Sequence, residues 1–337
     1  VATLPYLLSG TLASFTDAYF ECISGFTTTG ASILTDVERL PKGILFWRAQ
    51  TQWLGGMGII VLSIAILPFL GVGGMQLYKA EIPSPVVDKL TPRISDTART
   101  LWKIYILLTV AQIVLLLFGG LSWYDSVCHA FTTLPTGGFS TKNASVGHYH
   151  SAYVESIVVA FMFIAGINFS LHYKLIHGRR REFIRDPEFR AYLLVTGAFI
   201  LIVVLDVCGG KVYPTVWEAL RHATFSVVSL LTTTGFVTAD FEAWPALSQQ
   251  ILLLCMFLGG MAGSTGGGIK IVRVVLLVKH CYLEILRIIH PHAVTVVKLG
   301  RMAVPQTIMR GIWGFFILYI AIFVLAALAL AALGMDT

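Results

Sequence analysis

The stretch Phe26-Thr-Thr-Thr-Gly-Ala-Ser32 decides how this chain is expected to fold, because two variants of it follow. They read Leu134-Pro-Thr-Gly-Gly-Phe-Ser140 and Leu231-Thr-Thr-Thr-Gly-Phe-Val237. A single threonine–glycine turn is typical of an ordinary loop. Three of them, each after a short helical pattern and each before a hydrophobic segment, indicate an internal repeat.

Composition indicates that lipid is the solvent of this chain. Its 337 residues are 56% hydrophobic and only 12% charged, with a mean hydropathy of +0.79. A soluble domain usually carries about 25% charged residues. Five cysteines are too widely spaced for a metal site, and we interpret them as small buried apolar residues. They are Cys22, Cys128, Cys208, Cys255 and Cys281.

Six segments are long and apolar enough to cross a membrane, which takes about 20 residues. They are 44–70, 99–121, 151–177, 190–210, 246–280 and 307–334. Lysine and arginine gather in the connections 71–98, 178–189 and 281–306. An excess of these residues marks the cytoplasmic side. The net charge of +6 therefore reflects membrane topology, and we predict no nucleic-acid binding. All three Thr-Gly strings then lie on the outer side.

The segments before the strings are too short and polar to span, so we predict a short helix entering the membrane in each. These segments are Ser14–Phe26, Tyr124–Thr133 and Val216–Leu230. Carboxylates near their starts favour helix N-termini, and they are Asp17, Asp125 and Glu218. Non-helical backbone at membrane depth must be buried in protein or line a water-filled cavity. Three such loops therefore predict one shared aqueous axis.

Thr-Thr-Thr-Gly suits the coordination of a cation. Rings of backbone carbonyls can replace the hydration shell of an ion. Threonine prefers extended backbone and adds a hydroxyl oxygen, and glycine permits a turn with positive φ. The negative end of each short helix would also favour a cation. In the second string Pro135 replaces a threonine and loses its N–H, so that loop should interact differently with its surroundings.

Seven motifs, spread over nearly the whole chain, carry a resemblance to a known family. They are Phe20–Ser32, Gln52-Trp-Leu-Gly-Gly-Met-Gly-Ile-Ile60, Leu90-Thr-Pro-Arg-Ile94, Thr136–Ser140, Gly166-Ile-Asn-Phe169, Arg185-Asp-Pro-Glu-Phe189 and Gly259–Lys270. The chain resembles the membrane subunit of Trk/Ktr-type bacterial potassium uptake systems, most closely the Trk branch. The resemblance implies an all-α polytopic membrane protein of the bacterial inner membrane. Its fold is a pseudo-fourfold repeat of helix–re-entrant pore loop–helix units, as in a potassium channel.

By this resemblance, the three strings form a potassium filter. Its glycines are Gly30, Gly137 and Gly235, and the ion-facing carbonyls belong to Thr28, Thr29, Pro135, Thr136, Thr233 and Thr234. Potassium would bind at these residues only. The expected units are 1–70, a cytoplasmic linker 71–98, 99–180, 181–290 and the start of a fourth at 291–337. Only three of four pore loops are present, so we expect an internal piece of a longer chain.

Six glycines among ten residues interrupt the fifth hydrophobic segment at 259–268. A nucleotide-binding loop would need Gly-Lys-Ser/Thr and a preceding strand, which are missing here. Close helix packing is one interpretation, and a flexible gate below the filter is the other. The resemblance implies the gate, formed by Gly259, Gly260, Gly263, Ser264, Thr265, Gly266, Gly267 and Gly268. Lys270 and Arg273 are predicted to face the cytoplasmic mouth.

Further candidates carry weaker signals. His148 and His150 are compatible with zinc, but without a third ligand nearby they favour a solvated loop. Arg48 and Glu155 lie near the outer ends of hydrophobic segments, with either an interfacial role or a paired role around the filter. No arrangement of residues indicates an enzyme.

The predicted function is gated uptake of potassium, with a preference over sodium weaker than that of filters with Gly-Tyr-Gly, and with rubidium also passing. The alternative is an ion- or proton-coupled secondary transporter, which should place an ionisable residue near the membrane midplane. A membrane receptor or scaffold without transport activity is the third functional class, but such a protein would have no need for three re-entrant Thr-Gly loops. The resemblance implies a homodimer and a cytoplasmic TrkA-like regulatory subunit that binds a nucleotide, NAD or ATP. No covalent cofactor is expected, and the regulatory subunit would dock on 71–98 and 281–306.

Overall fold

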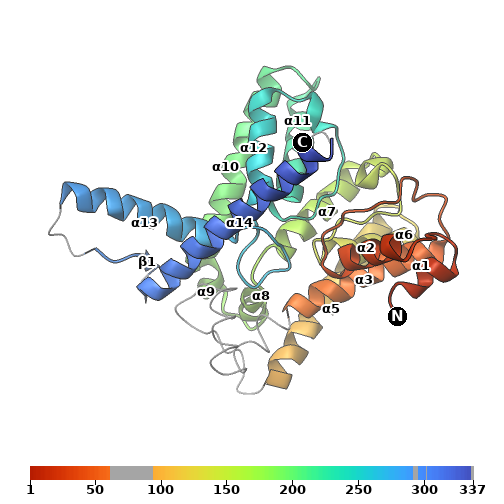
Figure 1. The fold of residues 1–337 in the computed structure, drawn as a ribbon, viewed down its shortest axis with the longest axis horizontal. Helices are drawn as coiled ribbons and strands as arrows, with labels where there is room; N and C mark the ends of the chain where they lie inside the picture. The colour runs from red at the N-terminus through yellow and green to blue at the C-terminus, as the bar shows by residue number, and fades with distance from the viewer. Residues whose placement is uncertain (61–93, 291–294, 301, 335–337) are drawn as a thin grey trace.

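A computed structural model describes residues 1–60, 94–290, 295–300 and 302–334 (Figure 1). The described part is helical apart from one two-stranded hairpin. The predicted linker 71–98 lies mostly outside the described residues, as do 61–70 of the first predicted span and most of the motif 90–94.

Residues 1–60 form three helices, each longer than the one before it. The helices are α1 (Leu4–Leu8), α2 (Phe15–Phe26) and α3 (Lys42–Ile60). Helix α2 confirms the short helix predicted before the first string. Two glycines on α3 let this helix approach its neighbours closely, since a Cβ at Gly55 would overlap the carbonyl of Phe26 and one at Gly56 would overlap Pro135.

The next part of the chain, up to residue 176, also places a short helix before a longer one. It contains α5 (Ile94–Phe118), α6 (Trp123–Thr133), the 3-10 helix η3 (Ser145–Tyr149), α7 (Ala152–Ala165) and α8 (Phe169–Ile176). Ser122 caps α6 by accepting a hydrogen bond from the amide of Asp125 at 3.0 Å. The cap and the carboxylate in the first turn explain why the helix begins there.

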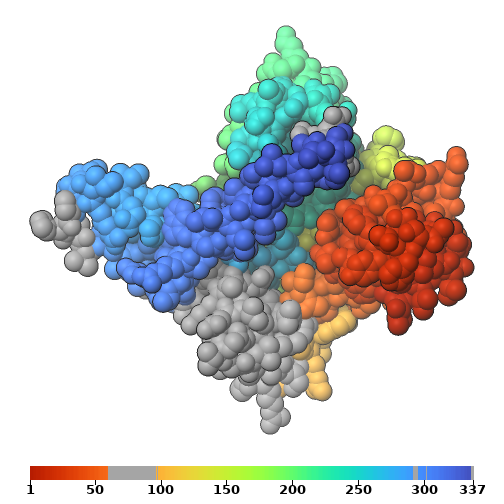
Figure 2. All heavy atoms as spheres, in the orientation of Figure 1, coloured from red at the N-terminus to blue at the C-terminus, as the bar shows by residue number. Residues whose placement is uncertain are grey.

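The rest of the chain, from residue 180 onward, holds the third short helix and two helices joined by the glycine-rich segment. Its elements are α9 (Arg180–Arg185), α10 (Pro187–Gly209), α11 (Val216–Leu231), η4 (Phe241–Ala243), α12 (Ala246–Phe257), α13 (Ile271–Ile289), β1 (Lys298–Leu299), β2 (Met302–Ala303) and α14 (Gln306–Ala332). Strands β1 and β2 pair antiparallel. Helix α13 projects from the body, and α14 crosses the face turned to the viewer (Figures 1 and 2).

Among the described residues, three helices are long and apolar enough to cross a membrane. They comprise Ala98–Phe118, Pro187–Gly209 and Gln306–Ala332, and the pair α7–α8 adds a fourth if it counts as one span. That pair bends by 100°, which corrects the prediction of one continuous span over 151–177. The bend has a local cause, because the Asn168 side chain caps α8 by accepting from the amide of Ser170 at 2.8 Å.

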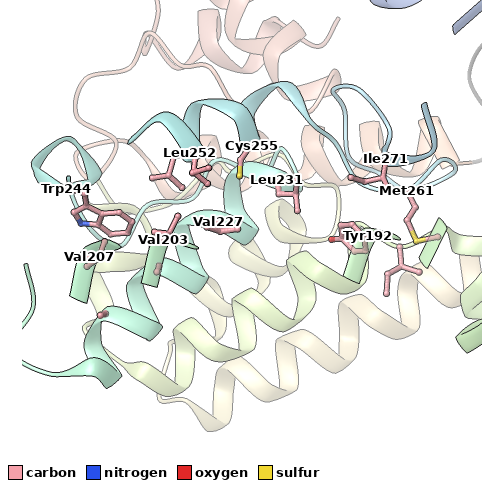
Figure 3. Close-up of a cluster of buried hydrophobic side chains, with 14 of the residues drawn as sticks. Tyr192, Val203, Val207, Val227, Leu231, Trp244, Leu252, Cys255, Met261 and Ile271 are labelled. Atoms are coloured by element: carbon pink, nitrogen blue, oxygen red, sulfur yellow. The ribbon is translucent and has the colours of Figure 1, made fainter. Parts of the chain in front are cut away.

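One apolar cluster joins α10, α11 and α12 to the glycine-rich segment (Figure 3). Val203 and Val207 of α10 pack with Val227 of α11 and Leu252 of α12, all 1% exposed or less. Met261 and Ile271 extend the same cluster to the glycine-rich segment and the start of α13. This packing fixes the broken segment relative to the helix that leads into the third string.

Candidate functional site

The three Thr-Gly strings share one backbone conformation. We call residues 27–32, 135–140 and 232–237 loops 1, 2 and 3. In loop 1 the amide of Thr28 donates to the carbonyl of Gly25 at 3.0 Å, and that of Thr29 donates to Ser24 at 3.0 Å. This pair of bonds is the Schellman ending of a helix. Loops 2 and 3 repeat it from Thr136 and Gly137, and from Thr233 and Thr234.

A threonine occupies the left-handed position of each Schellman ending, where glycine is usual. The φ angles are 55° at Thr28, 55° at Thr136 and 59° at Thr233. Positive φ is a steric outlier for a β-branched residue, and such strain concentrates at functional sites. Among the described residues, no hydrogen bond reaches the carbonyl oxygens of these three threonines. The carbonyls therefore remain available to a ligand.

The turn glycines are Gly30, Gly138 and Gly235, with φ of 78°, 78° and 81°. This corrects the predicted register by one residue in loop 2, where Gly137 was expected to make the turn. Gly137 instead occupies the position of Thr29 and Thr234. Loop 2 contains two adjacent glycines, so the sequence alone does not show which of them makes the turn.

The loops contact one another in chain order. A Cβ added at Gly30 would overlap the carbonyl oxygen of Gly137, and one added at Gly138 would overlap that of Thr234. A Cβ added at Gly235 would meet no atom within 4 Å. Each of the first two turn glycines thus packs on the next loop, and segments far apart in sequence share one site.

Hydrogen bonds also join the segments that follow loops 1 and 2. Asn143 donates from its side-chain amide to Asp36 at 2.9 Å and accepts from the amide of Val37 at 2.8 Å. The bond from Asn143 is the main reason that the pKa of Asp36 lies below its usual range. Asp36 therefore stays ionised and keeps accepting this bond.

Two ion pairs join helices that precede or follow the loops, and sequence reasoning left their roles open. Arg48 of α3 pairs with Glu21 of α2 at 2.8 Å, with side chains 3% and 0% exposed. Glu155 of α7 accepts two bonds of 2.6 Å from Arg221 of α11. Both predicted residues therefore have paired roles. Their partners were not predicted, because the charges of each pair lie on different helices.

The glycine-rich segment, residues 258–270, hydrogen-bonds to loop 3 and to the residue that precedes loop 2. The hydroxyl of Thr265 donates to the carbonyl of Leu134 at 2.9 Å and of Ala165 at 3.2 Å. The amide of Gly267 donates to the hydroxyl of Thr233 at 2.7 Å. The same segment bonds to the bend between α7 and α8, where Met261 donates from its amide to Gly166 at 2.8 Å. The segment therefore lies next to the loops in the structure.

Two basic residues at the C-terminal end of this segment and just beyond it are buried. Lys270 and Arg273 are each 4% exposed. The ammonium of Lys270 donates back to the carbonyl of Gly266, and the guanidinium of Arg273 lies 3.9 Å from the ring centre of Phe315 on α14. Their placement at a cytoplasmic mouth remains a prediction.

The structure offers no support for the zinc alternative at His148 and His150. Within residues 1–60, 94–290, 295–300 and 302–334, no group of three or more His, Cys, Asp or Glu side chains is placed to hold a metal ion. All five cysteines are free thiols in the structure.

Comparisons with known proteins agree with this geometry. The family model "TrkH: Cation transport protein" matches residues 2–337. The chain is 46% identical to the "Trk system potassium uptake protein TrkH" of Escherichia coli (strain K12), covering 100% of this chain and 70% of that protein. It is 40% identical to the TrkG protein of the same organism, over 96% and 67% of the two chains.

A solved structure has the same fold. The potassium transporter TrkH from Vibrio parahaemolyticus superposes with a TM-score of 0.89 at 41% identity, covering 99% of this chain and 69% of that one. The strings, their shared backbone and these matches agree with the predicted resemblance. The chain belongs to the TrkH family of cation transport proteins.

Proposed function

We propose that this chain forms the potassium pathway of a Trk-type uptake system in a bacterial inner membrane. The observation that carries the proposal is the strained threonine at the same position of three loops that pack on one another. Carbonyl oxygens without other partners suit an ion that has lost its hydration shell. The similar proteins of Escherichia coli and Vibrio parahaemolyticus are described as potassium transporters, which supports the choice of ion.

The proposed filter consists of the loop carbonyls around Thr28, Thr136 and Thr233. The C-terminal ends of α2, α6 and α11 point their partial negative charge toward the loops, which favours a cation. A fourth loop, as in the pseudo-fourfold arrangement, would complete the ring between loops 3 and 1. Gly235, with open space beside it, suits that contact.

The glycine-rich segment is the proposed gate. Thr265 bonds to Leu134, the residue before loop 2, and Gly267 bonds to loop 3, so a movement of the segment would break contacts at the proposed filter. Glycine lowers the cost of such a change in backbone conformation. The regulatory subunit that would drive it, a nucleotide-binding protein, is proposed to dock on the cytoplasmic connection 281–306, and the chain is proposed to act as a homodimer.

The filter proposal is tested by comparing rubidium and sodium uptake into vesicles that contain the full-length protein. Gly138→Ser should reduce the rubidium-to-sodium ratio by about tenfold, equivalent to about 1.4 kcal/mol, because its side chain would strike the carbonyl of Thr234. Gly178→Ser is the matched control, since Gly178 has the same φ of 78° and open space around it.

Equal ratios in both variants and in the unchanged protein would refute the filter. Uptake that saturates and depends steeply on pH would then favour the coupled transporter.

A further inference from the structure

Hydrogen bonds from hydroxyl groups within the loop and at the end of the preceding helix stabilise loops 1 and 3. In loop 1 the hydroxyls of Thr27 and Thr29 pair at 2.7 Å, and Ser24 donates to the carbonyl of Ala31 at 2.5 Å. Loop 3 repeats both bonds at 2.8 and 2.7 Å, with Thr232, Thr234, Ser229 and Phe236. Each of these loops is therefore held in shape from within.

Loop 2 makes neither of these bonds. Pro135 and Gly137 occupy the positions of the paired threonines, so their hydroxyl groups are missing. Thr132 occupies the position of the serine, but its hydroxyl donates back into α6, to the carbonyl of Cys128 at 3.1 Å. Loop 2 has the same strained backbone as the others and needs another source of support.

Gln52 of α3 supplies that support from outside the loop. Its side-chain amide donates to the carbonyl of Gly137 at 2.8 Å and accepts from the amide of Phe139 at 3.2 Å. The side chain is fully buried, at 0% exposed. A Cβ on Gly137 would overlap this amide, so the first glycine of the pair in loop 2 leaves room for Gln52.

The position of Gln52 is itself fixed by the next residue on α3. The indole of Trp53 donates to the hydroxyl of Thr109 at 3.1 Å and stacks on Phe131 of α6 with ring centres 5.0 Å apart. Tyr105 donates to the carbonyl of Trp53 at 3.1 Å. Because α5 and α6 hold Trp53, the amide of Gln52 has little freedom to leave loop 2.

We infer that Gln52 is a positioning residue of the filter, which sets the shape of loop 2 and its spacing from loop 1. The inference rests on the proposed function. Its geometric basis is that Gln52 binds the carbonyl of Gly137, the same atom on which Gly30 of loop 1 packs. Loss of the bond would free this carbonyl to move toward or away from the ion, and so alter which ion fits.

The test is Gln52→Met, which keeps the length of the side chain and removes both hydrogen bonds. Gln112→Met is the matched control: Gln112 is also 0% exposed, lies on α5, and its amide has no hydrogen-bond partner among the described residues. In vesicles of the full-length protein, Gln52→Met should lower the rubidium-to-sodium uptake ratio by about tenfold, the effect of one or two lost hydrogen bonds. Gln112→Met should leave the ratio unchanged.

A second variant keeps the inference testable if Gln52→Met fails to fold. Gln52→Glu retains the shape but turns a carboxylate oxygen toward the carbonyl of Gly137, so it should also lower the ratio. A folded variant of either kind with an unchanged ratio would overturn the inference. If Gly138→Ser lowers the ratio while both Gln52 variants preserve it, only the inference fails. If Gly138→Ser also preserves it, the proposed filter fails.

Discussion

The buried pair of Glu21 and Arg48 shows how single residues hold a loop in place. Ser32, at the end of loop 1, donates to Glu21 at 3.0 Å and accepts from Arg48 at 3.0 Å. The guanidinium also lies 4.1 Å from the ring centre of Phe139 in loop 2. One arginine therefore contacts both loops and neutralises the carboxylate behind them.

Removing one charge of this pair should destabilise the protein strongly. Glu21→Gln leaves the guanidinium of Arg48 buried without a counter-charge, which typically costs about 3–5 kcal/mol. The double variant Glu21→Gln/Arg48→Met should recover part of that loss, because no uncompensated charge remains. Thermal unfolding of the purified protein in detergent measures both changes.

The control for this experiment is the exposed pair of Asp36 and Arg39, whose side chains are 37% and 88% exposed. Arg39→Met should leave the unfolding temperature unchanged, since exposed pairs contribute little. A small effect of Glu21→Gln, similar to that of Arg39→Met, would contradict the assigned role.

The glycine-rich segment acts as one element that touches the loops above it. The hydroxyl of Thr265 donates out of the segment, to the carbonyls of Leu134 and Ala165, whereas the hydroxyl of Ser264 donates within it, to Met261 at 2.6 Å. If the segment is a gate, the bonds of Thr265 favour the conformation seen here. Breaking them should shift the gate toward an alternative conformation.

Thr265→Val keeps the shape of the side chain and removes both bonds. If the gate is closed in this structure, basal rubidium uptake without the regulatory subunit should rise about fivefold to tenfold, because the closed state loses about 1 kcal/mol of stability. Ser264→Ala should change it little. Equal uptake by the two variants, at equal amounts of protein in the membrane, would argue for a packing role instead of a gate.

The three short helices were predictable from sequence, and much of the site was not. Helices α2, α6 and α11 lie within two residues of their predicted ends, because carboxylates near their starts and Thr-Gly turns mark both boundaries. The bend between α7 and α8 was missed, since an apolar run of this length reads as one span. The role of Gln52 was also missed, because it depends on a contact between residues 85 positions apart.

At the scale of the whole molecule, α13 presents an apolar face that the described residues leave largely exposed. Val278, Tyr282, Ile285 and Ile289 are spaced along one side of this helix and are 58–66% exposed. The first three line an apolar groove of about 880 Å³ that α14 closes on its other side with Trp313 and neighbouring residues. A large exposed apolar patch marks a surface that contacts either lipid or another protein. The proposed homodimer would cover this face with a second copy of the chain.

Ile285→Glu should therefore weaken the dimer, because a carboxylate buried in an apolar interface must lose its hydration. Ile184→Glu on α9 is the matched control, since Ile184 is 59% exposed and Ile285 is 58% exposed. We expect size-exclusion chromatography with light scattering in detergent to show mostly monomer for Ile285→Glu and dimer for Ile184→Glu. A dimer that persists in Ile285→Glu would place the interface elsewhere. A monomer in both variants and in the unchanged protein would mean that the chain works without a second copy.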